Sequence, residues 1–90
     1  MAAEIDEMTE YDWFAEGKKL EAQGKYEEAI KAYEESIRLR PDLAKSWFYK
    51  AVLHFKLGQK DKATESAKKA IEIKPSWEKM LKRDYPDFPL

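Results

Sequence analysis

The stretch from Trp13 to Pro41, WFAEGKKLEAQGKYEEAIKAYEESIRLRP, decides the fold because the chain repeats its pattern 34 residues later. The second copy, WFYKAVLHFKLGQKDKATESAKKAIEIKP, runs from Trp47 to Pro75. Six positions are identical in this register: Trp13 and Trp47, Phe14 and Phe48, Gly24 and Gly58, Ala29 and Ala63, Ile37 and Ile71, Pro41 and Pro75. A fixed period in this range is typical of solenoid proteins, in which each repeat is one supersecondary unit. We therefore expect two copies of one structural unit.

Each copy has the pattern of two helices joined by a tight turn. Trp13, Gly17 and Leu20 fall on one face of a helix over about 11–23. Thr9 followed by Asp12 resembles a capping box at its start. A glycine in mid-helix costs about 0.5–1 kcal/mol relative to alanine, so we expect another helix to approach Gly17 closely.

The turns between helices carry residues that end one helix and permit the next. Gly24 can end the first helix in the left-handed conformation, and a second helix follows over about 26–39. Pro41 stops that helix, and Asp42 is the expected cap of the next one. The second copy repeats this plan with helices over about 43–57 and 60–73.

The last helix of the second copy buries small residues. Its predicted inner stripe contains Ala63, Ala67 and Ala70. Such a stripe predicts either a closer neighbour or a bulkier element lying over it. A short helix within 76–84 would cover the second copy with Trp77, Met80 and Leu81.

The two ends of the chain are expected to be irregular. Residues 1–9 are acidic and without a clear pattern, so we expect them to be frayed. Two prolines make the tail over 85–90 extended. Tyr85, Phe88 and Leu90 suggest a hypothesis in which this tail folds back into the protein's own groove or a neighbour's.

Composition excludes several classes of function. The chain has no cysteine and a single histidine, and it lacks a glycine-rich phosphate loop, so we expect no catalytic site, no metal site and no cofactor. His54 aligns with Leu20 and is expected to be a core histidine. The lysines do not form one stripe, which argues against nucleic-acid binding. No apolar run could span a membrane, and no secretory signal is visible, so we expect a cytoplasmic location.

The net charge of −1 conceals two halves of opposite sign. Residues 1–43 carry twelve acidic and six basic residues, a balance of −6, whereas residues 44–90 carry six acidic and eleven basic residues, a balance of +5. This polarity would steer an acidic partner to the second half or favour head-to-tail self-association. The alternative is that each helix simply keeps a solvated face.

Both copies resemble the tetratricopeptide repeat. The matching residues are Trp13, Gly17, Gly24, Tyr26, Ala29, Tyr33, Ser36 and Pro41 in the first copy, and Trp47, Ala51, Gly58, Ala63, Ala67, Ala70 and Pro75 in the second. The second copy is the less regular one, because Lys60 and Ala67 stand where the first has Tyr26 and Tyr33. The resemblance implies an all-α fold, a right-handed superhelix (solenoid) of two helix–turn–helix units over 10–43 and 44–77 with a capping helix.

The resemblance also implies a function, which is binding a peptide segment of another protein in a concave groove. That groove is lined mainly by the first helix of each pair. The candidate lining residues here are Tyr11, Phe14, Lys18, Lys45, Phe48, Tyr49, Val52, Lys56, Lys79 and Arg83. Apolar groups rimmed by Lys and Arg suit a peptide with hydrophobic anchors and acidic ends. The alternative is that Phe14 and Phe48 merely stack between neighbouring helices.

One subfamily clamps the acidic C-terminal carboxylate of chaperones with Lys and Asn from three first helices. Lys79 and Arg83 match the basic pair of the third helix. Phe14, Lys18 and Tyr49 replace the other expected residues, so the chain departs from a true clamp. A competing function is structural: an isolated repeat domain, or one that forms a weak homodimer through exposed repeat faces, with no separate ligand.

Overall fold

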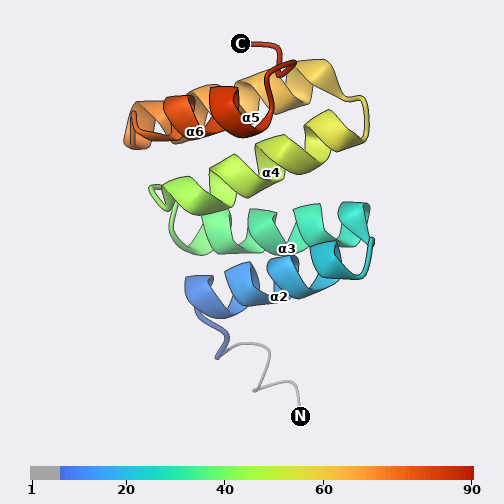
Figure 1. Cartoon of the computed structure of the whole chain (residues 1–90). Coiled ribbons are helices and arrows are strands. Elements are labelled where there is room, and N and C mark those ends of the chain that lie inside the picture. Colours follow the sequence, from blue (N-terminus) through green and yellow to red (C-terminus); the bar gives the residue numbers. More distant parts are fainter. Residues whose placement is uncertain (1–6) are drawn as a thin grey trace.

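Two helical hairpins and a short final helix are stacked one after another (Figure 1). The computed structural model describes residues 7–90, so the predicted fraying of residues 1–6 lies outside the described part. The helices are α2 (Glu10–Ala22), α3 (Tyr26–Leu39), α4 (Ala44–Lys56), α5 (Lys60–Ile73) and α6 (Trp77–Asp84). Residues 7–90 contain no strand, and the predicted all-α helical repeat fold is confirmed. The right hand of the superhelix stays a prediction.

The turns form largely as their residue types predict. The Thr9 side chain accepts a hydrogen bond from the backbone N–H of Asp12 at 3.1 Å, and the Thr9 N–H donates to the Asp12 carboxylate at 2.9 Å. Gly24 and Gly58 have φ values of 77° and 78°, the left-handed conformation expected at these helix ends.

The prediction that Asp42 caps α4 is wrong. The residue that precedes the helix is Leu43, and no side chain caps it. The Asp42 carboxylate instead accepts a hydrogen bond from the Arg40 guanidinium at 3.2 Å. The turn around Pro41 therefore directs Asp42 back toward the end of α3 rather than forward to α4.

The Tyr33 ring of α3 lies directly against Gly17 of α2. A Cβ atom built on Gly17 would lie within 3.0 Å of three atoms of the Tyr33 ring. Tyr33 itself is fully buried. The predicted close helix approach at Gly17 is confirmed, and the neighbouring element is this tyrosine ring.

The first core lies between the two hairpins. Tyr33 and Ile30 of α3 pack with Leu53 of α4, so α4 joins the two hairpins. The hydroxyls of Ser36 and Ser46 hydrogen-bond to each other at 2.8 Å inside the same α3–α4 contact. This pairing satisfies two buried polar groups that would otherwise be costly.

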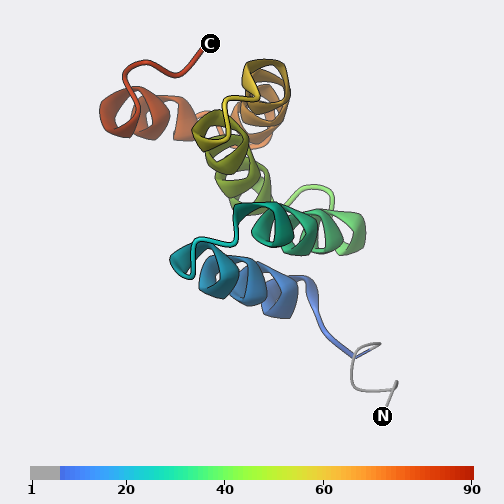
Figure 2. The same cartoon turned by 90° about the vertical axis from the view of Figure 1, so that its right-hand side faces the viewer.

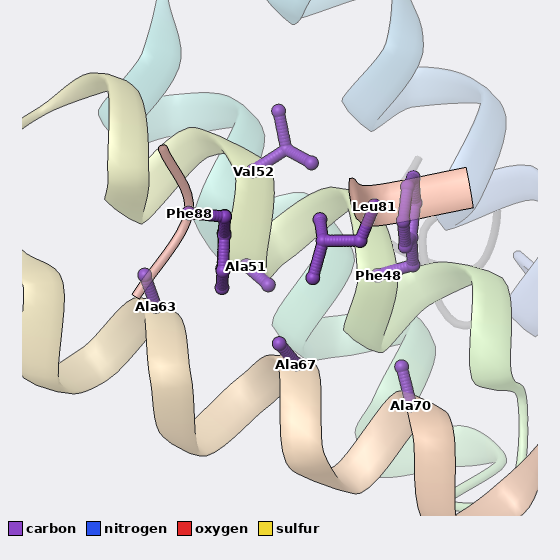
Figure 3. Close-up of a cluster of buried hydrophobic side chains, with 8 residues drawn as sticks. All are labelled: Phe48, Ala51, Val52, Ala63, Ala67, Ala70, Leu81 and Phe88. Atoms are coloured by element: carbon purple, nitrogen blue, oxygen red, sulfur yellow. The ribbon is translucent and has the colours of Figure 1, made fainter. Parts of the chain in front are cut away.

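The second core lies between α4, α5 and the C-terminal segment. Figure 3 shows the side chains of Leu81 and Phe88 above the three alanines of α5 (Ala63, Ala67 and Ala70). All five residues are buried. The small-residue stripe of α5 therefore has the bulkier covering that it predicts.

The C-terminal tail over 85–90 folds back over the part of the predicted groove that Phe48 and Val52 were expected to line. Phe88 packs against α4 and α5, and the Thr64 hydroxyl of α5 donates a hydrogen bond to the Pro89 carbonyl. Figure 2 shows this tail at the α5–α6 end of the stack, away from α2. The tail therefore leaves the faces of α2 and the start of α4 uncovered.

His54 is a core residue, as predicted. It is buried, and its Nδ1 atom lies 2.7 Å from the Gln59 side-chain oxygen. The bond joins the last turn of α4 to the residue that precedes α5. His54 thus has a packing role and a hydrogen-bonding partner.

Candidate functional site

Five of the ten candidate residues come together on α2 and α4. We call them the aromatic–lysine cluster: Tyr11, Phe14 and Lys18 of α2, and Lys45 and Tyr49 of α4. The cluster forms because first helices of successive hairpins lie on the same side of the stack (Figure 2). Tyr11 is exposed and the other four are partly exposed, so this surface faces solvent.

Lysine ammonium groups lie over aromatic rings throughout this cluster. Lys45 Nζ is 4.5 Å from the Phe14 ring centroid and 5.3 Å from that of Tyr11. Lys18 Nζ is 3.8 Å from the Tyr49 centroid. These distances are within the range of cation–π attraction. The rings hold each ammonium at the surface, where it can still meet an anion.

The aromatic rings of the cluster rest on the buried ring of Tyr33. Phe14 lies 5.6 Å and Tyr49 6.1 Å from it, centroid to centroid, and Phe14 meets Tyr49 edge-on at 5.5 Å. The Tyr33 hydroxyl donates a hydrogen bond to Glu21 at 2.8 Å. Burial is the larger cause, and the hydrogen bond to Glu21 the smaller one, of a raised pKa for the Tyr33 hydroxyl, so the phenol stays neutral. The rings of the cluster therefore pack on a buried and uncharged side chain.

The two lysines of the cluster differ in their ionic partners. Lys18 Nζ lies 3.9 Å from the Glu21 carboxylate, a weak exposed pair. Lys45 has no carboxylate within 4.0 Å among residues 7–90. Lys45 is thus the cation of the cluster with the most capacity for an external anion.

Two candidate residues, Phe48 and Val52, do not line any surface. Phe48 is 4% exposed and Val52 is 1% exposed. The Phe48 ring stacks on Trp77 of α6, with 4.4 Å between the ring centroids. For Phe48, the alternative expectation of stacking between neighbouring helices is therefore the correct one. Their prediction as exposed lining residues is wrong, because α6 and Phe88 cover this face of α4.

The three remaining candidates lie outside the cluster. Lys56, at the end of α4, has its Nζ 5.6 Å from the Tyr26 ring centroid of α3. Arg83 Nε donates a hydrogen bond to its neighbour Asp84 at 3.0 Å, and Lys79 is exposed on α6. Among the described residues, no ion pair, hydrogen bond or cation–π contact joins Lys79 or Arg83 to the aromatic–lysine cluster.

A cavity of about 430 Å³ adjoins the cluster at the junction between repeats. Tyr11 and Lys45 belong to both, and its other lining residues are Asp42, Leu43, Ala44, Ile73, Lys74 and Trp77. Sequence reasoning missed these six residues, although they flank Pro41 and Pro75, which mark the ends of the two copies. The indole N–H of Trp77 is buried and has no hydrogen-bond acceptor among residues 7–90.

Some of the charged side chains around this cavity are in ion pairs, and others are not. Lys74 Nζ lies 5.8 Å from the Trp77 ring centroid and is not in an ion pair with any residue of 7–90. Arg40 is engaged, since it contacts Asp42 at 3.2 Å, Glu10 at 3.9 Å and the Tyr11 hydroxyl at 2.8 Å. Lys45 and Lys74 are therefore the two lysines lining this cavity whose ammonium groups could pair with a carboxylate of a ligand.

No group of three or more His, Asp or Glu side chains in residues 7–90 lies close enough together to hold a metal ion. None of the described helices is long and apolar enough to cross a membrane.

The comparisons with known proteins agree with the repeat pattern. The family model described as "Tetratricopeptide repeat" matches residues 14–76, well over half of the chain. This family is generally a protein–protein interaction module and typically a non-enzymatic scaffold. The comparison with curated proteins found no match.

Proposed function

Because the chain belongs to the tetratricopeptide repeat family, whose general role is protein–protein interaction, we propose that it binds a peptide segment of a partner protein on the aromatic–lysine cluster. The peptide carries at least one carboxylate and one or two apolar side chains. The adjoining cavity of about 430 Å³ receives one of those side chains.

The observation that carries this proposal is the position of Lys45. Its ammonium group lies over the Phe14 and Tyr11 rings, borders the cavity, and has no carboxylate partner among residues 7–90. A cation held over aromatic rings beside a recess that Leu43 and Ile73 help to line matches a ligand in which an acidic group stands next to an apolar one.

The geometry assigns separate tasks to the residues of the cluster. The rings of Phe14 and Tyr49 give apolar contact area with little conformational entropy to lose, since Tyr33 already supports them. Lys45 gives the charge that selects acidic peptides.

A binding experiment tests the role of Lys45. A fluorescent peptide with one phenylalanine, one leucine and three C-terminal acidic residues is titrated with the protein, and its Kd is read from anisotropy. Lys45→Gln removes the charge and should weaken binding about fivefold, the effect of roughly 1 kcal/mol. The control Lys68→Gln, at an exposed position of α5, should leave Kd unchanged.

Two results would contradict the proposal. One is equal weakening by Lys45→Gln and Lys68→Gln, which would reveal only a general attraction of acids to lysines. The other is unchanged binding when the acidic residues of the peptide become Asn and Gln. Raising the salt concentration should weaken binding to the unmodified protein more than to Lys45→Gln.

Self-association is the competing function, and it is separated by a different measurement. Sedimentation velocity at two protein concentrations reports whether a dimer forms as concentration rises. A monomer at both concentrations supports peptide binding as the use of the exposed cluster. A dimer that disappears with Lys45→Gln would assign the cluster to contacts between copies.

A further inference from the structure

The C-terminal tail takes the place of helical turns that α6 lacks. Helix α6 has 8 residues, whereas the corresponding helices α2 and α4 have 13 each. Phe88 lies one repeat period of 34 residues after His54, so the two residues correspond in the repeat alignment. An extended segment with two prolines thus follows α6 at the register positions where α4 continues as a helix.

The second repeat leaves an unfilled space that the tail occupies. In the first repeat the ring of Tyr33 fills the gap between α2, α3 and α4. The matching residue of the second repeat is Ala67, which lacks that ring. Figure 3 shows Phe88 and Leu81 above the α5 alanines, where they supply the missing volume from another segment.

Apolar packing and one side-chain hydrogen bond from α5 hold the tail in its seat. The Phe88 ring is buried and lies 5.1 Å from the Phe55 centroid, and the Tyr85 ring meets Phe55 edge-on at 6.2 Å. The Thr64 hydroxyl donates the hydrogen bond from α5 to the tail, at the Pro89 carbonyl. The backbone N–H groups of Phe88 and Leu90 bond within the tail itself. The attachment therefore depends on two rings and one hydroxyl.

We propose that this seat is an exchangeable docking site, bound in cis by residues 85–90 and in trans by a peptide segment with the same pattern. That pattern is Tyr-Pro-x-Phe-Pro: two aromatic rings three residues apart in an extended, proline-bearing segment. The seat is distinct from the aromatic–lysine cluster, because it lies at the α5–α6 end and is lined by alanines and Phe55.

Competition by the tail sets the apparent affinity for a peptide in trans. The apparent Kd equals the intrinsic Kd divided by the fraction of molecules whose seat is open. Weakening the tail in cis should therefore strengthen binding in trans. This behaviour separates a docking site from ordinary core packing, since a lost core contact alone creates no affinity for a free peptide.

The test uses the full chain and a fluorescent peptide with the sequence of residues 84–90, DYPDFPL. Phe88→Ala in the protein should lower the apparent Kd at least tenfold relative to the unmodified chain. The control Leu90→Ala, at an exposed position, should bind like the unmodified chain. A peptide with alanine in place of its phenylalanine should not bind any of the three proteins.

If the Phe88→Ala protein loses its helical circular dichroism signal, a second variant provides the test. Tyr85→Ala removes the contact of the tail with Phe55 and leaves every residue of the seat in place, and it should lower the apparent Kd about threefold. If Tyr85→Ala stays folded and binds the peptide no more tightly than the unmodified chain, the proposal is wrong. It is also wrong if the alanine-bearing peptide binds as well as the original one.

Discussion

At the scale of single residues, Gly17, Tyr33 and Glu21 form the contact on which the first repeat depends. The Tyr33 ring lies directly over Gly17, and its hydroxyl donates to Glu21 at 2.8 Å. The same ring supports Phe14 and Tyr49 of the aromatic–lysine cluster. A change at Gly17 or Tyr33 should therefore affect both stability and the shape of the candidate site.

The substitution Gly17→Ala should destabilise the protein by about 1–3 kcal/mol, the usual cost of overpacking. The added methyl would meet Tyr33 ring atoms within 3.0 Å, and this cost exceeds the roughly 0.5–1 kcal/mol that alanine gains in a helix. The measurement is the free energy of unfolding in urea. In the reverse control, Ala15→Gly at an exposed position of α2, the loss should be only about 0.5–1 kcal/mol. A Gly17→Ala protein more stable than the original would refute the close-approach account.

The raised pKa of Tyr33 gives a pH dependence with a definite sign. In the unfolded chain a tyrosine loses its proton near pH 10, whereas buried Tyr33 keeps it. The unfolded state then binds fewer protons than the folded state, so the free energy of unfolding falls as pH rises above about 10. Tyr33→Phe should be less stable at pH 7 and should lose less stability between pH 9 and about 11. Parallel pH profiles for the two proteins would show that Tyr33 does not contribute.

At the scale of single helices, the N-terminal ends of α2 and α6 are capped differently. Helix α2 has a complete capping box between Thr9 and Asp12. Helix α6 begins after Ser76, whose side chain makes no capping hydrogen bond. Similar residue types thus give different local stabilisation, because only one has the required extended backbone before the helix.

This difference predicts unequal effects of two alanine substitutions. Thr9→Ala should cost about 1 kcal/mol, because it removes the acceptor for the Asp12 N–H. Ser76→Ala should change stability by less than about 0.5 kcal/mol. Thermal unfolding of both variants at one pH provides the comparison. Equal losses would mean that the capping box contributes nothing beyond helix propensity.

The cap helix α6 covers the second repeat with the side chain of Leu81. Leu81 is 1% exposed within the core of α4 and α5, so Leu81→Ala should cost about 2–5 kcal/mol. Met80, its neighbour on α6, is only partly buried, and Met80→Ala should cost clearly less. Urea unfolding gives both values. A loss below about 1 kcal/mol for Leu81→Ala would show that α6 is not the cover of the second repeat.

At the scale of the whole molecule, features that depend on nearby residues were predictable. The hairpin turns at Gly24 and Gly58, and the covering of the α5 alanines, follow from helical periodicity and turn chemistry. Sequence reasoning also brought together Tyr11, Phe14, Lys18, Lys45 and Tyr49, because all five belong to the first helices of the two pairs, where the family resemblance implies the groove.

Features that depend on where distant segments lie were not predictable. Phe48 and Val52 have the spacing of groove residues, but the path of α6 and Phe88 buries them. The cavity joins Tyr11 to Lys74, which lie far apart in the chain. Asp42 is a common cap residue, yet the turn at Pro41 pairs it with Arg40. Local sequence patterns predict where the helices lie in the chain, whereas the contacts between distant segments are known only from the three-dimensional structure.

The central claim is that the exposed faces of α2 and α4 form the peptide-binding surface. The most direct test is an amide-shift titration of the labelled protein with the acidic, phenylalanine-bearing peptide. Shifts should concentrate at Tyr11, Phe14, Lys45 and Tyr49, with little change at Thr64 and Phe88. Shifts confined to Thr64 and Phe88, or none at saturating peptide, would contradict the claim.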